Sequence, residues 1–168
     1  MGALKIAGGI LVLFAAAMAG FSENAAMKRS IRLTEGFVHA LSFLKEDMHF
    51  SMDYLDKTLK NCVPFAGSAR AFFESVSEKI SGGAGAGEVW EEELKKLPDL
   101  NADALSALCE LGHVLGKTDA QSQKKQIEAC IERLKHILEA QTNEQKTKGV
   151  LLQKCSVAGG LLIVILLL

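Results

Sequence analysis

The sequence predicts an all-α protein, a bundle of five to six helices between an N-terminal and a C-terminal transmembrane helix. Only 2 of the 168 residues are proline, and strong helix formers such as Ala, Leu, Glu and Lys are abundant. Apolar side chains in the middle of the chain recur at steps of three and four, which is typical of one helix face. Each end of the chain contains an uncharged apolar stretch, over 6–21 and over 157–168. We therefore predict a transmembrane helix over 1–21, a helical bundle over 22–148 and a second transmembrane helix over 149–168.

The first apolar stretch, over 6–21, contains no charged residue. A helix rises about 1.5 Å per residue, so this stretch together with residues 1–5 reaches the roughly 30 Å of a hydrocarbon core. A cleaved secretory signal peptide is the alternative. Lys5 would provide its short basic start, and the small residues Ala17 and Ala19 fit a cleavage site.

The second apolar stretch, over 157–168, has no polar face. A buried C-terminal helix is the alternative, but such a helix would be amphipathic. With residues 150–156 added the stretch is long enough to span, and the amine of Lys154 can extend to the lipid headgroups. We therefore expect the chain to cross the membrane here a second time.

Basic residues set the expected orientation. They cluster after the first span and before the second, at Lys28, Arg29, Arg32, Lys146, Lys148 and Lys154. Because Lys and Arg remain on the cytoplasmic side, both spans place the bundle in the cytosol.

Small residues within the spans predict close helix packing. They include Ala16, Gly20, Gly159 and Gly160. Close backbone approach lets helices associate in lipid, so we expect the spans to pack on each other or on copies in a homo-oligomer.

Two apolar stripes predict the first helices of the bundle. The stripe over 36–60 comprises Phe37, Leu41, Leu44, Met48, Met52, Leu55 and Leu59. Pro64 ends it, because proline disfavours helix in the preceding residue. The next stripe comprises Phe65, Ala69, Phe72, Val76 and Ile80. The glycine-rich residues 81–87 predict a flexible loop. Their glycines do not match the order G-x-G-x-x-G, and they follow a helix and not a strand, so a dinucleotide site is not expected.

Three more helices are predicted after this loop. A short helix over 88–97 turns Trp90, Leu94 and Leu97 inward and ends at Pro98. A helix over 102–115 carries Leu105, Leu108 and Leu115 on its stripe. A long helix from Asp119 turns Ile127, Ile131, Leu134 and Leu138 to the core. Residues 142–148 have no large apolar side chain, so we expect this helix to leave the bundle there and cross solvent toward the membrane.

Residues 112–118 superficially resemble a phosphate-binding loop. That loop needs four residues between its glycines and a preceding strand, and neither condition is met here. Gly112 and Gly116 instead lie four residues apart, so that one face of the helix is bare and another helix can approach closely. Gly116 can also end the helix in the left-handed conformation, with Thr118 or Asp119 capping the next one.

No pattern of residues indicates catalysis, a cofactor or a small-molecule substrate. The four histidines, His39, His49, His113 and His136, lack metal-ligand spacing, and the 4 cysteines form no C-x-x-C pair and are expected to be reduced. With 19 basic against 20 acidic residues, general nucleic-acid binding is not expected. We interpret Glu91, Glu92 and Glu93 as a solvated face.

One motif resembles a known family. It comprises Leu111, Gly112, Leu115, Gly116, Asp119 and Gln123, and the chain ends in Gly159 and Gly160 followed by LLIVILLL. These residues resemble the stage III sporulation protein AB family of endospore-forming Firmicutes. Trp90 and the Phe72-Phe73 pair support the resemblance, whereas Lys45 stands where the family pattern has a carboxylate.

The resemblance implies a role. The soluble domain of this family is similar in fold to the cytosolic domain of the type II secretion inner-membrane platform protein. The resemblance implies that the protein is a non-enzymatic subunit of the channel complex between mother cell and forespore. It also implies a location in the mother-cell membrane around the forespore. Its implied partners are other subunits, including a cytosolic ATPase. As a candidate docking surface we select the carboxylates Asp53, Asp56, Glu91, Glu92 and Glu93.

Two other functions fit the layout of the chain. A two-span sensor would carry its cations on the opposite flanks and an output domain after the second span. A secreted, lipid-anchored helical protein would have its small residues upstream of the hydrophobic tail, whereas Gly159 and Gly160 lie within it.

Overall fold

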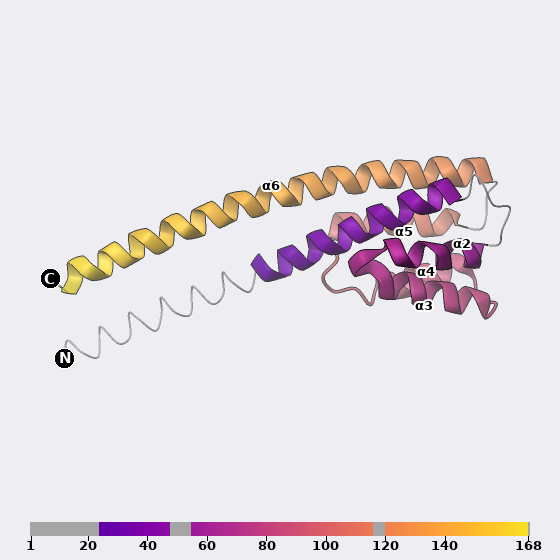
Figure 1. Cartoon of the computed structure of the whole chain (residues 1–168), viewed down its shortest axis with the longest axis horizontal. Coiled ribbons are helices and arrows are strands. Elements are labelled where there is room, and N and C mark those ends of the chain that lie inside the picture. The colour runs from indigo at the N-terminus through magenta and orange to yellow at the C-terminus, as the bar shows by residue number, and fades with distance from the viewer. Residues whose placement is uncertain (1–23, 48–54, 116–119, 168) are drawn as a thin grey trace. The chain divides into compact units, whose positions relative to one another are not determined.

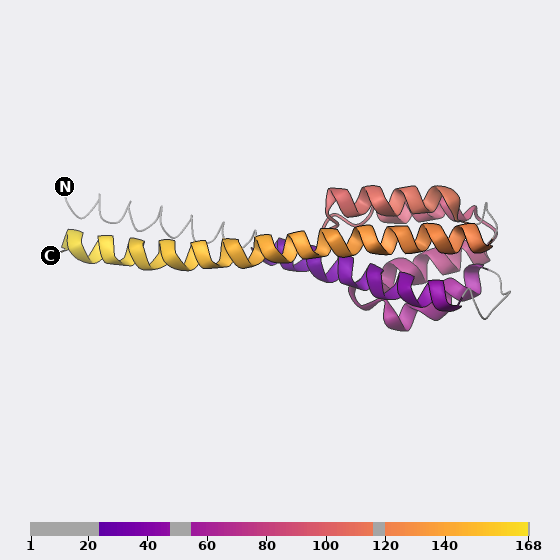
Figure 2. The same ribbon diagram turned by 90° about the horizontal axis from the view of Figure 1, so that it is seen from above.

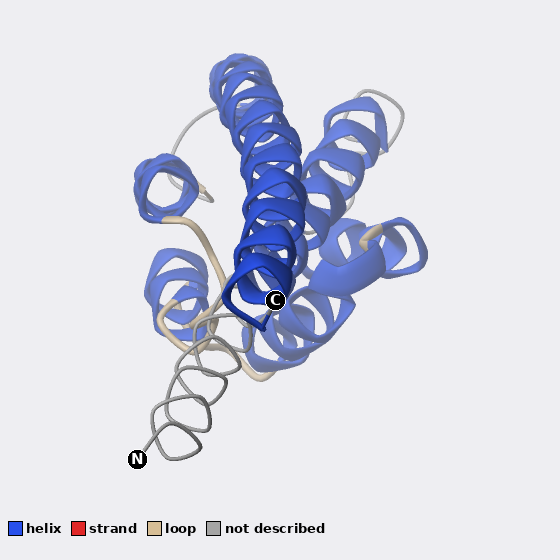
Figure 3. Cartoon of the chain, turned by 90° about the vertical axis from the view of Figure 1, so that its left-hand side faces the viewer, coloured by secondary structure: helices blue, strands red, loops and turns tan. Residues whose placement is uncertain are grey.

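The computed structural model describes residues 24–47, 55–115 and 120–167, with side chains as far as Lys148. All regular structure in these ranges is helical, as Figure 3 shows. The all-α prediction is therefore confirmed for this part of the chain.

A helix over residues 24–47 comes first. It is followed by α2 (Leu55–Cys62), the short 3-10 helices η1 (Val63–Phe65) and η2 (Gly67–Ala69), and α3 (Arg70–Ser81). The remaining helices are α4 (Ala86–Leu94), α5 (Ala102–Val114) and α6 (Ala120–Leu167), as labelled in Figure 1. Together with the first helix, α2 to α6 make six α-helices in the described ranges, within the five to six predicted.

The chain divides into two compact units, one of residues 29–140 and one of 1–28 with 141–168. The larger unit is the helical bundle. In the smaller unit, the side-chain oxygen of Asn24 accepts a hydrogen bond from Gln145 Nε2 at 3.4 Å.

Aromatic rings form the centre of the bundle. Phe37 of the first helix meets Phe72 of α3 edge-on, with ring centroids 5.0 Å apart, and Phe72 meets Trp90 of α4 in the same way at 4.8 Å. All three side chains are buried. Burial of such large side chains is the main force holding these helices together.

Within the bundle, α6 lies between the first helix and α5, as Figure 2 shows. Lys45 of the first helix pairs with Glu128 of α6 at 3.3 Å, and Arg133 of α6 pairs with Glu110 of α5 at 2.8 Å. Between these two ion pairs, Ile127, Ile131 and Leu134 are buried, as their spacing predicted. The fourth predicted core residue, Leu138, is only half-buried, and Ile137 packs against the core.

The stripe predicted over 36–60 is shared by two helices. Phe37, Leu41 and Leu44 are buried in the first helix and Leu59 is buried in α2. Met48 and Met52 lie outside the described residues. Leu55 of α2 is half-buried. The described members of the predicted stripe therefore lie on two helices, and four of these five members are buried.

The second predicted stripe is wrong at its first member. Phe65 lies in η1 and is 49% exposed, and α3 begins only at Arg70. The reason is local. The Val63-Pro64-Phe65 turn leads into Gly67, whose φ of 48° redirects the backbone before α3 can begin. Ala69, Phe72 and Val76 are buried as predicted.

Among the residues described with their side chains, no helix is both long and apolar enough to cross a bilayer. The first predicted span, over 1–21 with Ala16 and Gly20, lies outside the described residues. The backbone of α6 is helical to Leu167, but the side chains of 149–168, which include Gly159 and Gly160, also lie outside. Both spans therefore stay predictions.

Candidate functional site

Trp90 of α4 joins α4 to α5. Its side chain is fully buried, and its Nε1 donates a hydrogen bond to the backbone oxygen of Leu108 at 2.8 Å. A buried indole N–H requires an acceptor, and the α5 backbone provides it. Trp90 and the Leu-Gly motif of α5, far apart in the sequence, therefore form one packing unit.

Gly112 lies directly beneath the indole. A Cβ at this position would lie 2.6 Å from Trp90 Cδ1 and 3.3 Å from Trp90 Cγ. The bare face at Gly112, where another helix was expected to approach, is covered by the Trp90 side chain of α4 and not by a helix backbone.

The other motif residues divide into two groups. Leu111 and Leu115 are buried, and so is Gln123 in α6. Gly116 and Asp119 lie outside the described residues. α5 ends at Val114, one residue earlier than predicted, because Leu115 takes an extended conformation with ψ of 126°. The described part of the motif serves packing between α4, α5 and α6.

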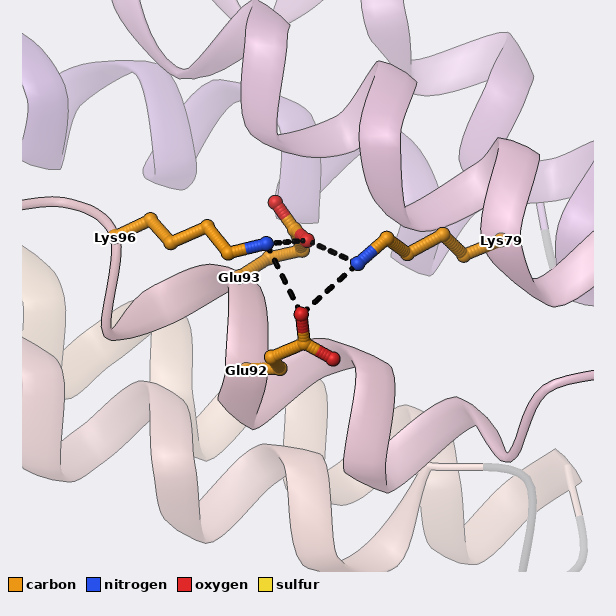
Figure 4. Close-up of polar contacts among 4 residues, drawn as sticks. All are labelled: Lys79, Glu92, Glu93 and Lys96. Atoms are coloured by element: carbon orange, nitrogen blue, oxygen red, sulfur yellow. Dashed lines mark hydrogen bonds and ion pairs between the residues drawn. The ribbon is translucent and has the colours of Figure 1, made fainter.

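A cluster of four charged residues connects α3 to α4 (Figure 4). Lys79 of α3 lies 2.7 Å from Glu93 Oε1 and 3.0 Å from Glu92 Oε1. Lys96, just after α4, contacts the same two oxygens at 2.7 and 3.0 Å. Each ammonium group thus bridges both carboxylates, and the formal charges of the cluster cancel.

The electrostatics of this cluster follow from its geometry. Hydrogen bonds from Lys79 and Lys96 lower the pKa of the Glu93 carboxyl to about 2. Hydrogen bonds from Lys96 and Lys79 also lower the pKa of Glu92, and the pKa of both lysines is raised in return. All four groups are therefore charged at neutral pH.

The interpretation of Glu91, Glu92 and Glu93 as one solvated face is wrong for Glu93. Its side chain is 8% exposed, against 59% for Glu92. Consecutive residues on a helix point about 100° apart, so three in a row cannot share a face. Glu91 points elsewhere, and its Oε1 lies 3.0 Å from Nδ1 of His113 on α5.

The candidate docking residue Asp56 lies in the first turn of α2. Its Oδ2 accepts a hydrogen bond from Ser81 Oγ at 3.1 Å, at the end of α3. Lys79, which holds Glu92, is in the same last turn of α3. Tertiary structure thus brings Asp56 and Glu92 to either side of one helix end. Asp53 lies outside the described residues.

Histidine and cysteine side chains do not gather at one place among the described residues. His39, His113 and His136 are exposed, and His49 lies outside the described residues. No cluster of potential metal ligands occurs among the described residues. The described cysteines are free thiols, and burial raises the pKa of Cys62 and of Cys130 to about 12.

Several residues that shape this site were not found from the sequence. The sequence does not indicate that Lys79 and Lys96 contact the same two carboxylates, those of Glu92 and Glu93. The tertiary structure shows these contacts. Asn101 caps α5 by accepting hydrogen bonds from the backbone N–H groups of Asp103 and Ala104. An asparagine before a helix was the available signal for that cap.

Comparison with known proteins identifies relatives. The sequence model of the stage III sporulation protein AB family matches residues 5–168. A solved structure titled stage III sporulation protein AB is similar in fold, with a TM-score of 0.64 and 22% sequence identity. The similarity covers 71% of this chain and 98% of that chain. No curated protein sequence matches this chain significantly.

Proposed function

This chain belongs to the stage III sporulation protein AB family, and we propose that it is a non-enzymatic platform subunit of a secretion-like membrane complex in endospore formation. The family match over residues 5–168 is the observation that carries this proposal. In the proposed role, the two terminal spans anchor the chain in the mother-cell membrane around the forespore. The bundle lies in the cytosol, where it docks an ATPase to other subunits.

We propose a docking surface with fewer residues than the one selected from the sequence, because two of its carboxylates are already paired with lysines. Glu92 and Glu93 are neutralised by Lys79 and Lys96, so they offer little net charge to a partner. Among the described residues, the Asp56 carboxylate accepts a hydroxyl hydrogen bond from Ser81, and the Glu91 carboxylate pairs with the imidazole of His113. Among the described members of this set, Asp56 and Glu91 therefore have the least neutralised charge. Asp56 faces the end of α3 and Glu91 faces α5, so we propose them as two separate acidic contacts of the docking surface.

Charge reversal tests this surface. In sporulating cells, the full-length Asp56→Lys/Glu91→Lys protein should recover much less of the ATPase in a detergent pull-down than the wild type does. The expected loss reflects like-charge repulsion and the removal of favourable contacts. Glu139→Lys is the control, because Glu139 is exposed on α6 and has no ion pair among the described residues. Unchanged recovery with the double variant would refute the proposed surface, provided that circular dichroism shows a folded bundle.

The membrane arrangement needs its own test. Alkaline carbonate should not release the full-length protein from membranes, because two apolar helices keep it in lipid. External protease should leave the bundle intact in spheroplasts and digest it once they are lysed. Release by carbonate, or a mature protein that lacks its first nineteen residues, would contradict the two-span arrangement.

A further inference from the structure

One surface pocket of the bundle combines positive charge with an apolar wall. It has a volume of about 330 Å³ and lies between the first helix, η2 and the turn that follows α4. The first helix contributes Arg29 and Arg32 to its lining, and η2 contributes Ser68. Leu33, Leu97 and Pro98 supply apolar surface.

Asp99 fixes the position of the Arg29 guanidinium group. Its Nε donates to both carboxylate oxygens of Asp99 at 3.1 Å. A guanidinium has five N–H donors in a fixed fork. Because Asp99 engages the Nε side, the two terminal nitrogens of Arg29 remain available to a ligand. Asp99 thus orients Arg29 and also cancels one positive charge.

Arg32 and Ser68 supply further donors. Both side chains are exposed, and among the described residues neither makes a hydrogen bond or ion pair. Arg32 lies one turn along the helix from Arg29, so the two side chains share a face. The pocket therefore has two guanidinium groups and a hydroxyl but one carboxylate, which is already occupied.

We propose that this pocket binds a phosphate group carried on an organic molecule. A single guanidinium satisfies the two oxygens of a carboxylate. Two guanidiniums and a hydroxyl match the larger number of oxygens on a phosphate group. The wall of Leu33, Leu97 and Pro98 contacts the carbon portion of the molecule. This binding site goes beyond the platform role and does not require the ATPase or the docking surface.

The same chemistry could come from a phospholipid headgroup or from a soluble phosphate ester, so the experiment has two arms. Full-length protein in a non-ionic detergent is titrated with glycerol 3-phosphate in one arm. In the other it is titrated with dihexanoyl phosphatidylglycerol below its micellar concentration. A glutamate-rich peptide is titrated in the same way as a comparison probe. Binding is followed by the rise in Tm, because a ligand that binds only the folded state stabilises it. All titrations are made at constant ionic strength.

Arg32→Gln is the diagnostic variant, because Arg32 has no described partner whose loss would disturb folding. Losing a charge-assisted hydrogen-bonding group should weaken binding by about tenfold or more. Ser68→Ala should weaken it less. Lys57→Gln is the matched control, since it removes one exposed positive charge on α2, outside the pocket, and should leave binding unchanged.

Each outcome of these titrations either supports or refutes the proposed phosphate site. Arg32-dependent binding of either probe supports the site and identifies the source of the phosphate. If neither probe binds, or if Arg32→Gln and Lys57→Gln weaken binding equally, the site is refuted. Tighter Arg32-dependent binding of a glutamate-rich peptide than of both phosphate probes would assign the pocket to an acidic protein partner and overturn the proposal. None of these results depends on ATPase recruitment.

Discussion

Gly112 shows how one hydrogen atom in place of a methyl group can decide a helix contact. The Trp90 indole occupies the space that a Cβ at this position would need. An alanine there would have to displace a buried ring that is also held by its hydrogen bond to Leu108. Interiors are close-packed, so such a displacement spreads to neighbouring side chains.

We expect Gly112→Ala to destabilise the bundle by about 1 to 3 kcal/mol through overpacking. The sign of this stability change is informative, because replacing glycine with alanine in the middle of an unobstructed helix stabilises a protein by about 0.5 to 1 kcal/mol. Urea unfolding followed by circular dichroism and by Trp90 fluorescence measures the effect. An unchanged or increased stability would mean that the indole moves aside at no cost.

Glu93 predicts a dependence of stability on pH. Its pKa is lowered in the folded protein from an ordinary value of 4.5 to about 2 by hydrogen bonds from Lys79 and Lys96. A lowered folded-state pKa stabilises the fold fully above pH 4.5, and this contribution is lost as the pH falls through 2.

The Glu93→Gln variant should therefore be less stable than the wild type by about 1 to 2 kcal/mol at pH 7, the range expected for charge-assisted hydrogen bonds from exposed lysines. The difference in Tm should shrink steadily between pH 4.5 and pH 2. Glu139→Gln is the comparison, since this exposed glutamate has no ion pair among the described residues. A difference for Glu93→Gln that is the same at every pH would show that the lost interaction is not ionic.

At the scale of the element, α5 depends on a defined start. Asn101 has extended backbone angles, and its side-chain oxygen accepts from the N–H of Asp103 at 2.8 Å and of Ala104 at 3.4 Å. These two donors would otherwise be unpaired within the helix. Asn101 therefore supports α5, which carries the partner surface for Trp90.

Asn101→Ala should cost about 1 kcal/mol, and Asn101→Asp should retain most of the stability because aspartate caps helices equally well. The midpoint of urea unfolding compares the two variants with the wild type. If both variants lose the same stability, the amide nitrogen of Asn101 contributes more than the cap does.

At the scale of the whole molecule, buried cysteines report on cooperativity. Cys62 lies in α2 and Cys130 in α6, so they sample separate parts of the bundle. Burial raises the pKa of both thiols to about 12, and their sulfur atoms donate to backbone oxygens of Thr58 and Ala107. Neither thiol should react with maleimide in the native state.

As the urea concentration rises, both cysteines should become labelled with one shared midpoint, because small single bundles usually unfold as a unit. Mass spectrometry of the digested protein measures each site. The half-buried Cys109 of α5 should react first and serves as an internal positive control. A lower midpoint for Cys62 alone would show that α2 opens separately from the rest of the bundle.

Much of this molecule followed from the sequence. Apolar residues at helical spacing identified the buried faces of the first helix, α3, α5 and α6, because burial of one stripe is what makes a helix amphipathic. The Leu-Gly motif predicted both a family and a closely approached helix face at Gly112. These features are local or periodic, so a single chain reveals them.

Tertiary structure alone decided which side chains meet. It placed Trp90 on Gly112, buried Glu93 between two lysines from different parts of the chain, and left Phe65 exposed after a turn that interrupts the expected stripe. It also brought Arg29, Arg32 and Ser68 to one pocket. Periodicity specifies the inward face of each helix, but it does not specify the neighbour on that face, because neighbours are set by how several helices pack together.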